Sequence, residues 1–229
     1  MGKVGEGKGT AGTTPRFSPR SPVELVRRYV FLFAGLVVMA FGVALSIKSD
    51  LGTSPISSVP YALSEIVPLS VGATTVLLHC LLVLVQLAVL RRRFTPGRLV
   101  QVPVGVLFGA LTDIAMAAVV VVEPGAYWQR WLCCLAGVAL VAVGVAFEVK
   151  ADVVMLAGEG TVDAFCKAFP IQFGNMKVAF DVALVAVACT LGVVFLGRVV
   201  GVREGTLAAA VLVGLVSKRV GRLLRFSFA

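Results

Sequence analysis

Long apolar runs separated by short polar segments dominate the chain. A membrane-spanning helix needs about 20 mostly apolar residues, and six runs approach that length. The predicted spans are Tyr29–Ile47, Gly72–Leu90, Leu99–Val122, Trp131–Val149, Gly174–Leu196 and the shorter Gly205–Ser217. The pattern therefore predicts an all-α, polytopic transmembrane helical bundle with six spans.

Two further segments, 50–68 and 152–170, are too apolar for simple loops and too interrupted to span. In the first, Gly52 permits a sharp turn. Ser54 is a good helix N-cap, and Pro55 suits the first helical position. The prolines that follow leave room only for a short helix of under about 15 residues. The alternatives are re-entrant or broken helices, interfacial helices and full spans.

Composition and charge agree with a membrane protein. Of 229 residues, 59% are hydrophobic and only 14% are charged, whereas a soluble domain carries roughly 25% charge. This excludes a soluble globular protein. The net charge of +9 comes from clusters that flank the apolar runs, so we expect no nucleic-acid partner.

The positions of the basic residues predict the topology. With the N-terminus inside, 17 of the 21 Lys and Arg residues fall on the inner side of the six-span arrangement, as the positive-inside rule requires. Both termini are therefore predicted to be cytoplasmic. The predicted organisation is a disordered basic tail at 1–28, membrane halves at 29–122 and 131–217, and a second basic tail at 218–229.

The two halves resemble each other. Shifting the chain by 102 residues aligns 34–89 with 136–191 without a gap, and the matches include scarce residues: Lys48 with Lys150, Asp50 with Asp152, and Pro68 with Pro170. Three spans per half is an odd number, which predicts two inverted three-span repeats with re-entrant or broken helical segments, an architecture found in secondary transporters. If the broken segments were full spans, the copies would instead be parallel.

The run GVALSIKSDLGTSP at Gly42–Pro55 resembles the YczE/YitT-type family of bacterial integral membrane proteins, whose members carry an A-D-L-G-x-S-P element after an apolar helix. Ser49 stands where the family usually has Ala. The resemblance covers about Tyr29 to Leu224. It implies a multi-pass protein of the bacterial cytoplasmic (inner) membrane that acts as a permease or a membrane accessory protein.

A short helix whose N-terminus lies inside the membrane offers free N–H groups and a partial positive charge to a polar or anionic group. We therefore predict a substrate-binding site at the interface of the repeats. Its candidate residues are Lys48, Asp50, Gly52, Thr53, Ser54, Ser57, Lys150 and Asp152. The alternative is that Lys and Asp only flank helix ends and that the segments are structural.

Ionisable residues within spans are costly and suggest function. The only His, His79, aligns with Asp181 under the 102-residue shift, so the two could meet and carry a coupled proton. Asp113 shares a helix face with Gly105 and Gly109 and is a further proton-coupling candidate. The alternative for Asp113 is a structural hydrogen bond beside closely packed helices.

No motif of hydrolytic, metal-dependent or nucleotide-dependent enzymes is present, and a single His excludes a multi-His metal site. We therefore expect no enzymatic activity and no cofactor or metal. The predicted function is a secondary transporter or permease of a small polar or anionic solute, working by alternating access. A non-transporting membrane scaffold is the alternative. The expected partners are membrane lipids and a small-molecule solute, with a homodimer left open.

Reporter fusions test the predicted topology. A fusion after Arg98 is expected to give a cytoplasmic signal and a fusion after Pro124 a periplasmic signal, because the basic clusters should remain inside. The reverse signal at either position would contradict the six-span arrangement.

Overall fold

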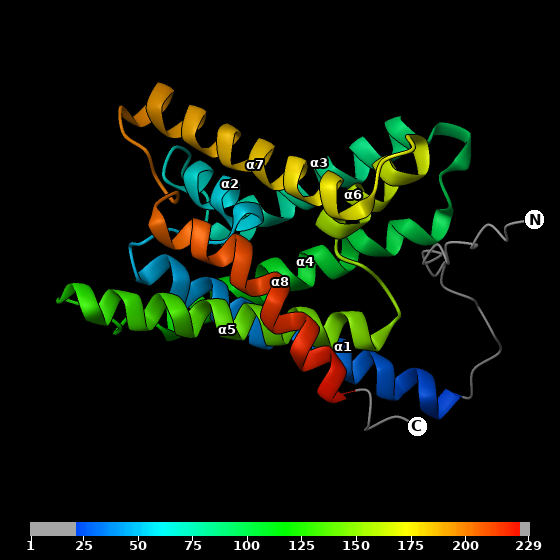
Figure 1. Ribbon diagram of the computed structural model, residues 1–229, viewed down its shortest axis with the longest axis horizontal. Coiled ribbons are helices and arrows are strands. Elements are labelled where there is room, and N and C mark those ends of the chain that lie inside the picture. Colours follow the sequence, from blue (N-terminus) through cyan, green and yellow to red (C-terminus); the bar gives the residue numbers. More distant parts are fainter. Residues whose placement is uncertain (1–21, 225–229) are drawn as a thin grey trace, which may run out of the picture.

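The computed structural model describes residues 22–224, and all regular elements in that range are helical. Six long helices run back and forth along a common direction, and two short helices lie among them (Figure 1). The helices are α1 (Pro22–Lys48), α2 (Pro55–Ser64), α3 (Val71–Leu90), α4 (Gln101–Ala118), α5 (Tyr127–Ala151), α6 (Ala157–Ala168), α7 (Phe173–Leu196) and α8 (Glu204–Leu224). Two 3₁₀ turns, η1 (Arg91–Arg93) and η2 (Pro96–Val100), join α3 to α4.

Five helices are long and apolar enough to cross a membrane: α1, α3, α4, α5 and α7. Helix α8 covers the sixth predicted span but does not meet the same criterion, because Lys218, Arg219 and Arg222 lie in its second half. The protein is therefore an all-helical, multi-pass membrane protein. The sixth span and the inverted repeats stay predictions.

The helix boundaries differ from the predicted tails. Helix α1 begins at Pro22, seven residues before the predicted first span, and an ion pair between Glu24 and Arg28 one turn apart supports this start. Helix α8 likewise runs to Leu224, into the predicted C-terminal tail. The rest of the predicted tails, 1–21 and 225–229, lies outside the described residues.

The two broken segments contain short buried helices. Helices of 10 and 12 residues are about 15 and 18 Å long, too short for a hydrocarbon core of about 30 Å, which excludes the full-span alternative. Helix α2 packs against α3 and α7, and α6 packs against the same two helices. The Ile56 side chain contacts Gly158, so the first turns of α2 and α6 meet inside the bundle.

The order of long and short helices is the same in both halves. Helix α2 starts at Pro55 and α6 at Ala157, and α3 starts at Val71 and α7 at Phe173, so both pairs of starts are 102 residues apart. Each short helix also packs on the opposite half. Helix α2 of the first half contacts α7 of the second, and α6 of the second half contacts α3 of the first.

Helices α1 and α5 form the most extensive contact and cross at glycines. The backbones of Gly42 and Gly137 touch, and so do those of Gly35 and Gly144. The absence of side chains lets the helices approach closely. Around them, Leu36, Met39 and other apolar residues build the main core.

We predict that Gly42→Ala separates α1 from α5. A Cβ at Gly42 would lie 2.6 Å from the Val141 nitrogen and 2.7 Å from the Gly137 oxygen, and these backbone atoms can move only if the helices part. Overpacking of this kind costs about 1–3 kcal/mol, so the thermal midpoint in detergent should fall.

The matched control is Gly214→Ala on α8, where nothing lies within 4 Å of the added methyl group. This change should leave the midpoint unchanged or raise it, because Ala favours helix. Equal midpoints for the two variants would contradict the close approach of α1 and α5.

Candidate functional site

The chain leaves α1 through a sharp turn at residues 49–52. Asp50 adopts a left-handed conformation with φ of 53°, and Gly52 has φ of 96°. The Ser49 hydroxyl stabilises the turn by donating to the Ser46 carbonyl at 2.6 Å and accepting from the Leu51 N–H at 3.2 Å. The predicted turn at Gly52 is therefore present.

Helix α2 begins as the capping pattern predicts, with Ser54 as N-cap and Pro55 in the first turn. The Ser54 hydroxyl, however, makes no capping bond to the backbone. It donates instead to the Ser57 hydroxyl at 3.0 Å, and both side chains are buried.

The segment 198–203, which we call the strap, links α7 to α8 and covers the turn. The Thr53 N–H donates to the Gly201 carbonyl at 3.1 Å. Just beyond the strap, the Gly205 N–H donates to the Leu51 carbonyl at 2.8 Å. The strap thus pairs backbone groups that would otherwise be unsatisfied within the bundle. The Thr53 hydroxyl is buried without a hydrogen-bond partner among the described residues.

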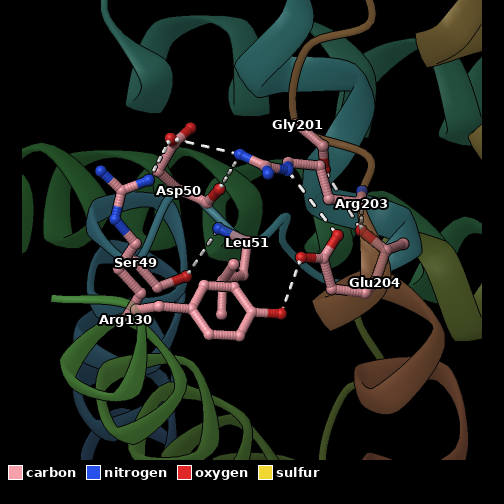
Figure 2. Close-up of polar contacts among 9 residues, drawn as sticks. Ser49, Asp50, Leu51, Arg130, Gly201, Arg203 and Glu204 are labelled. Atoms are coloured by element: carbon pink, nitrogen blue, oxygen red, sulfur yellow. Dashed lines mark hydrogen bonds and ion pairs between the residues drawn. The ribbon is translucent and has the colours of Figure 1, made fainter.

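Asp50 lies between two arginines from different parts of the chain (Figure 2). Its carboxylate is 3.0 Å from Arg130 at the start of α5 and 3.4 Å from Arg203 of the strap. Arg203 also donates to the Asp50 carbonyl at 2.9 Å and lies 3.7 Å from Glu204. The bond of Glu204 to its own backbone N–H, helped by Arg203 and the Tyr127 hydroxyl, lowers the pKa of the Glu204 carboxyl.

A pocket of about 400 Å³ opens between the turn, α2 and the strap. Its polar lining comes from Asp50, Gly52, Thr53, Tyr61, Glu65, Arg198 and Arg203. Glu65 and Arg198 form a loose ion pair at 3.7 Å. Burial raises the pKa of the Tyr61 phenol, and the Glu65 and Asp50 carboxylates raise it further, so the phenol remains a neutral donor. The pocket can therefore hold a small group that carries charge.

The predicted substrate-binding residues only partly come together here. Asp50, Gly52 and Thr53 line the pocket, whereas Ser54 and Ser57 do not. The ammonium of Lys48 is also absent from the lining, because it donates to the Val120 carbonyl at 3.3 Å. The positive charge of the pocket comes instead from Arg198 and Arg203.

Lys150 and Asp152 lie at the opposite end of the bundle, where α5 ends. Asp152 has φ of 47°, the same left-handed conformation as Asp50. Arg28 of α1 lies 3.5 Å from the Asp152 carboxylate and donates to the Ala151 carbonyl at 3.0 Å. We refer to the two ends of the molecule as the Asp50 end and the Asp152 end.

Each of the three proton-coupling candidates has its own set of contacts in the described residues. His79 is buried over Gly105 and stacks on Phe108, and its Nδ1 has no partner among the described residues. Asp181 pairs with Lys177 at 2.7 Å on its own helix. No hydrogen bond or ion pair between residues 22 and 224 joins His79 to Asp181.

Asp113 holds the start of α3. Its carboxylate accepts from the Ser70 hydroxyl and the Gly72 N–H, both at 2.7 Å. Gly72 and Gly109 are in backbone contact beside it. These contacts match the structural alternative for Asp113.

Sequence reasoning missed a buried polar network at the Asp152 end. The Gln86 amide donates to Gln101 at 2.8 Å and to the Ala157 carbonyl at 3.2 Å. Arg98 donates to Gln86 at 2.8 Å and also pairs with Asp163 of α6. The network fastens α6 to α3 and α4. Glutamines inside an apolar run were the available signal.

A second missed residue is Glu148, which is buried near the end of α5. Its carboxylate accepts from the Leu156 N–H at 2.6 Å, directly before α6. The arginines that pair with the two aspartates were missed as well. Arg28 and Arg130 are 102 residues apart, so extending the repeat alignment by a few residues would have found them.

No group of three or more His, Cys, Asp and Glu side chains within residues 22–224 could hold a metal ion. The site offers guanidinium, carboxylate and hydroxyl groups from three separate segments instead. This chemistry suits reversible binding of a charged group.

The family described as "Family of unknown function (DUF6198)" matches residues 26–222. The chain belongs to this family. Over 61 residues it is 43% identical to "Uncharacterized membrane protein YczE" of Bacillus subtilis (strain 168), which covers 26% of this chain and 28% of YczE. It is 26% identical to an "Uncharacterized protein" of Haemophilus influenzae over 187 residues, 82% of this chain and 79% of the relative.

These matches confirm the resemblance to YczE-type membrane proteins. No solved structure matches the chain.

We predict that Gly52→Ala loosens the strap of this DUF6198 protein. The methyl group would lie 2.7 Å from the Arg203 nitrogen, and the left-handed φ adds strain of about 1–2 kcal/mol. The thermal midpoint should fall, and limited proteolysis should cut the strap faster.

Gly197→Ala is the matched control, since Gly197 also has a positive φ but nothing lies within 4 Å of its added Cβ. Its thermal midpoint should fall only by the amount that the backbone strain causes, because the added methyl group meets no other atom. Identical losses in the two variants would mean that the strap does not press on Gly52.

Proposed function

We propose that the protein is a secondary transporter or permease for a small polar or anionic solute in the bacterial inner membrane, with both termini in the cytoplasm. Two inverted halves would expose a central site alternately to each side. The observation that carries the proposal is the meeting of the first turns of α2 and α6 inside the bundle, at Ile56 and Gly158.

Short helices that meet head to head inside a membrane direct their N-terminal N–H groups and partial positive charges to one place. Broken helices of this kind surround the binding sites of many transporters. Non-helical backbone at membrane depth persists only where protein or water covers it. Both features support a binding role more readily than simple packing.

The packing of each short helix on the opposite half also supports inverted repeats. Helix α2 of the first half packs on α7 of the second, and α6 of the second packs on α3 of the first. Each short helix therefore rests on the other half, so relative movement of the halves would displace both. Alternating access requires such coupling.

The pocket at the Asp50 end supports a route of entry. It leads from Arg198 and Glu65 to Gly52 and Thr53, where the segment turns into the bundle. Its two arginines and two carboxylates favour a ligand group that carries charge, and this agrees with a polar or anionic solute.

Transport by the full-length protein in proteoliposomes tests the proposal. We expect currents on a solid-supported membrane when phosphate, sulfate, lactate or L-alanine is supplied, with and without a pH gradient. Arg198→Gln should reduce the response by at least severalfold, because it removes a charge from the pocket mouth.

Arg92→Gln is the matched control, since Arg92 is exposed in η1, far from the pocket lining. It should transport normally. A complete lack of response to every probe by well-folded protein would instead favour the non-transporting scaffold.

A further inference from the structure

Two ion pairs close the ends of the α1–α5 contact in matching ways. At one end Asp50, just after α1, pairs with Arg130 of α5 at 3.0 Å. At the other end Asp152, just after α5, pairs with Arg28 of α1 at 3.5 Å. We call these pairs the Asp50 clasp and the Asp152 clasp.

The clasps are equivalent in sequence and in backbone geometry. The aspartates are 102 residues apart, and so are the arginines. Asp50 and Asp152 have φ of 53° and 47°, a conformation that non-glycine residues seldom adopt. Each aspartate comes from one half and its arginine from the other, so exchanging the halves converts one clasp into the other.

Between the clasps, α1 and α5 cross at two pairs of glycines. Gly35 and Gly42 of α1 face Gly144 and Gly137 of α5, backbone against backbone. Side chains such as Met39 and Val141 pack around these backbone contacts, so the glycine pairs are the points about which α1 can rock against α5. A rocking motion about this crossing shortens the distance between helices at one end and lengthens it at the other.

Each clasp also lies where a broken segment leaves its long helix. Asp50 leads into the turn at Gly52 and lines the pocket. Asp152 leads through residues 153–156 to the start of α6. Opening a clasp therefore frees the extended stretch that carries the neighbouring short helix.

We propose that Arg28–Asp152 and Arg130–Asp50 are the two gates of the molecule, which open alternately as α1 rocks on α5. This inference rests on the proposed transport function and adds residues to it. Arg28 and Arg130 are positioning residues that act through the aspartates, and neither needs to touch the solute.

The two clasps are weak enough to act as gates. Both aspartate side chains are more than half exposed, at 67% and 54%, and exposed ion pairs contribute about 0.2–1 kcal/mol each. Pairs this weak open thermally. Both clasps are closed in this structure, so each end state would open one weak pair and keep the other. The Asp50 clasp carries an additional arginine, Arg203 at 3.4 Å, and the two end states still differ by weak pairs only, as population shifts require.

Hydrogen–deuterium exchange of the full-length protein in nanodiscs tests the gates without any solute. Asp50→Asn removes the charge, while Asn still tolerates the left-handed conformation. Exchange at residues 51–54 should rise by about 1.5- to 5-fold, the range that corresponds to the strength of an exposed pair. Exchange at residues 153–156 should fall, because the opposite clasp becomes more populated.

Asp152→Asn should produce the reverse pattern. Arg28→Gln should reproduce the effect of Asp152→Asn. Arg130→Gln should change exchange in the same direction as Asp50→Asn but less, because Arg203 still lies 3.4 Å from the Asp50 carboxylate. The two arginine variants serve as a second pair should an aspartate variant fold poorly. Glu123→Gln is the matched control, since it removes an exposed negative charge from the loop between α4 and α5. This variant should leave hydrogen–deuterium exchange unchanged at residues 51–54 and at residues 153–156.

If hydrogen–deuterium exchange rose only at the mutated end and did not change at the other, the proposal of coupled gates would be wrong. The two clasps would then be independent surface ion pairs. Such a result would not affect transport by the unmodified protein. Reciprocal exchange in a protein that transports none of the probes would instead retain the coupled clasps and reject the permease.

Discussion

Two stretches of non-helical backbone inside a bundle of apolar helices impose the main constraint on this protein. Lipid offers no hydrogen bonds to exposed N–H and C=O groups, so other parts of the chain must pair them. The strap does so for Thr53, the start of α8 does so for Leu51, and Glu148 does so for Leu156. The arrangement of α7, α8 and the end of α5 follows from these requirements.

The α1–α5 crossing imposes a second constraint, because both broken segments begin at the ends of these two helices. Close glycine contacts fix how near the helices lie, and the segments leave from opposite ends. The short helices themselves pack against α3 and α7, so the crossing sets where each segment begins and the other two helices hold it in place.

Much of the architecture could be predicted from the apolar runs. The length of a run indicates the length of its helix, and prolines indicate where a helix is interrupted. The start of α2 at Pro55 and the turn at Gly52 follow from local backbone chemistry, and the structure has both. Side-chain pairing was less predictable. Lys48 donates to a carbonyl just beyond the end of α4, and Asp181 pairs with Lys177 one turn away on α7. Which partner a side chain reaches depends on the rotation and tilt of its helix, and a single sequence does not report these.

The predictions failed most clearly where a partner lay far away in the chain. Arg203 reaches Asp50 across 153 residues, and Arg98 reaches α6 across more than 60. Residue type alone does not reveal such contacts. The 102-residue spacing of Arg28 and Arg130 is the exception, since internal duplication supplies the comparison that one sequence otherwise lacks.

The polar network around Gln86 holds one of the two short helices more firmly than the other. Helix α6 is fastened to α3 and α4 by buried amides and Arg98, whereas α2 borders a pocket. In the proposed transporter, α2 would therefore shift more readily than α6 as the halves move. A difference in stiffness between the two short helices is thus built into a fold in which both halves have the same order of helices.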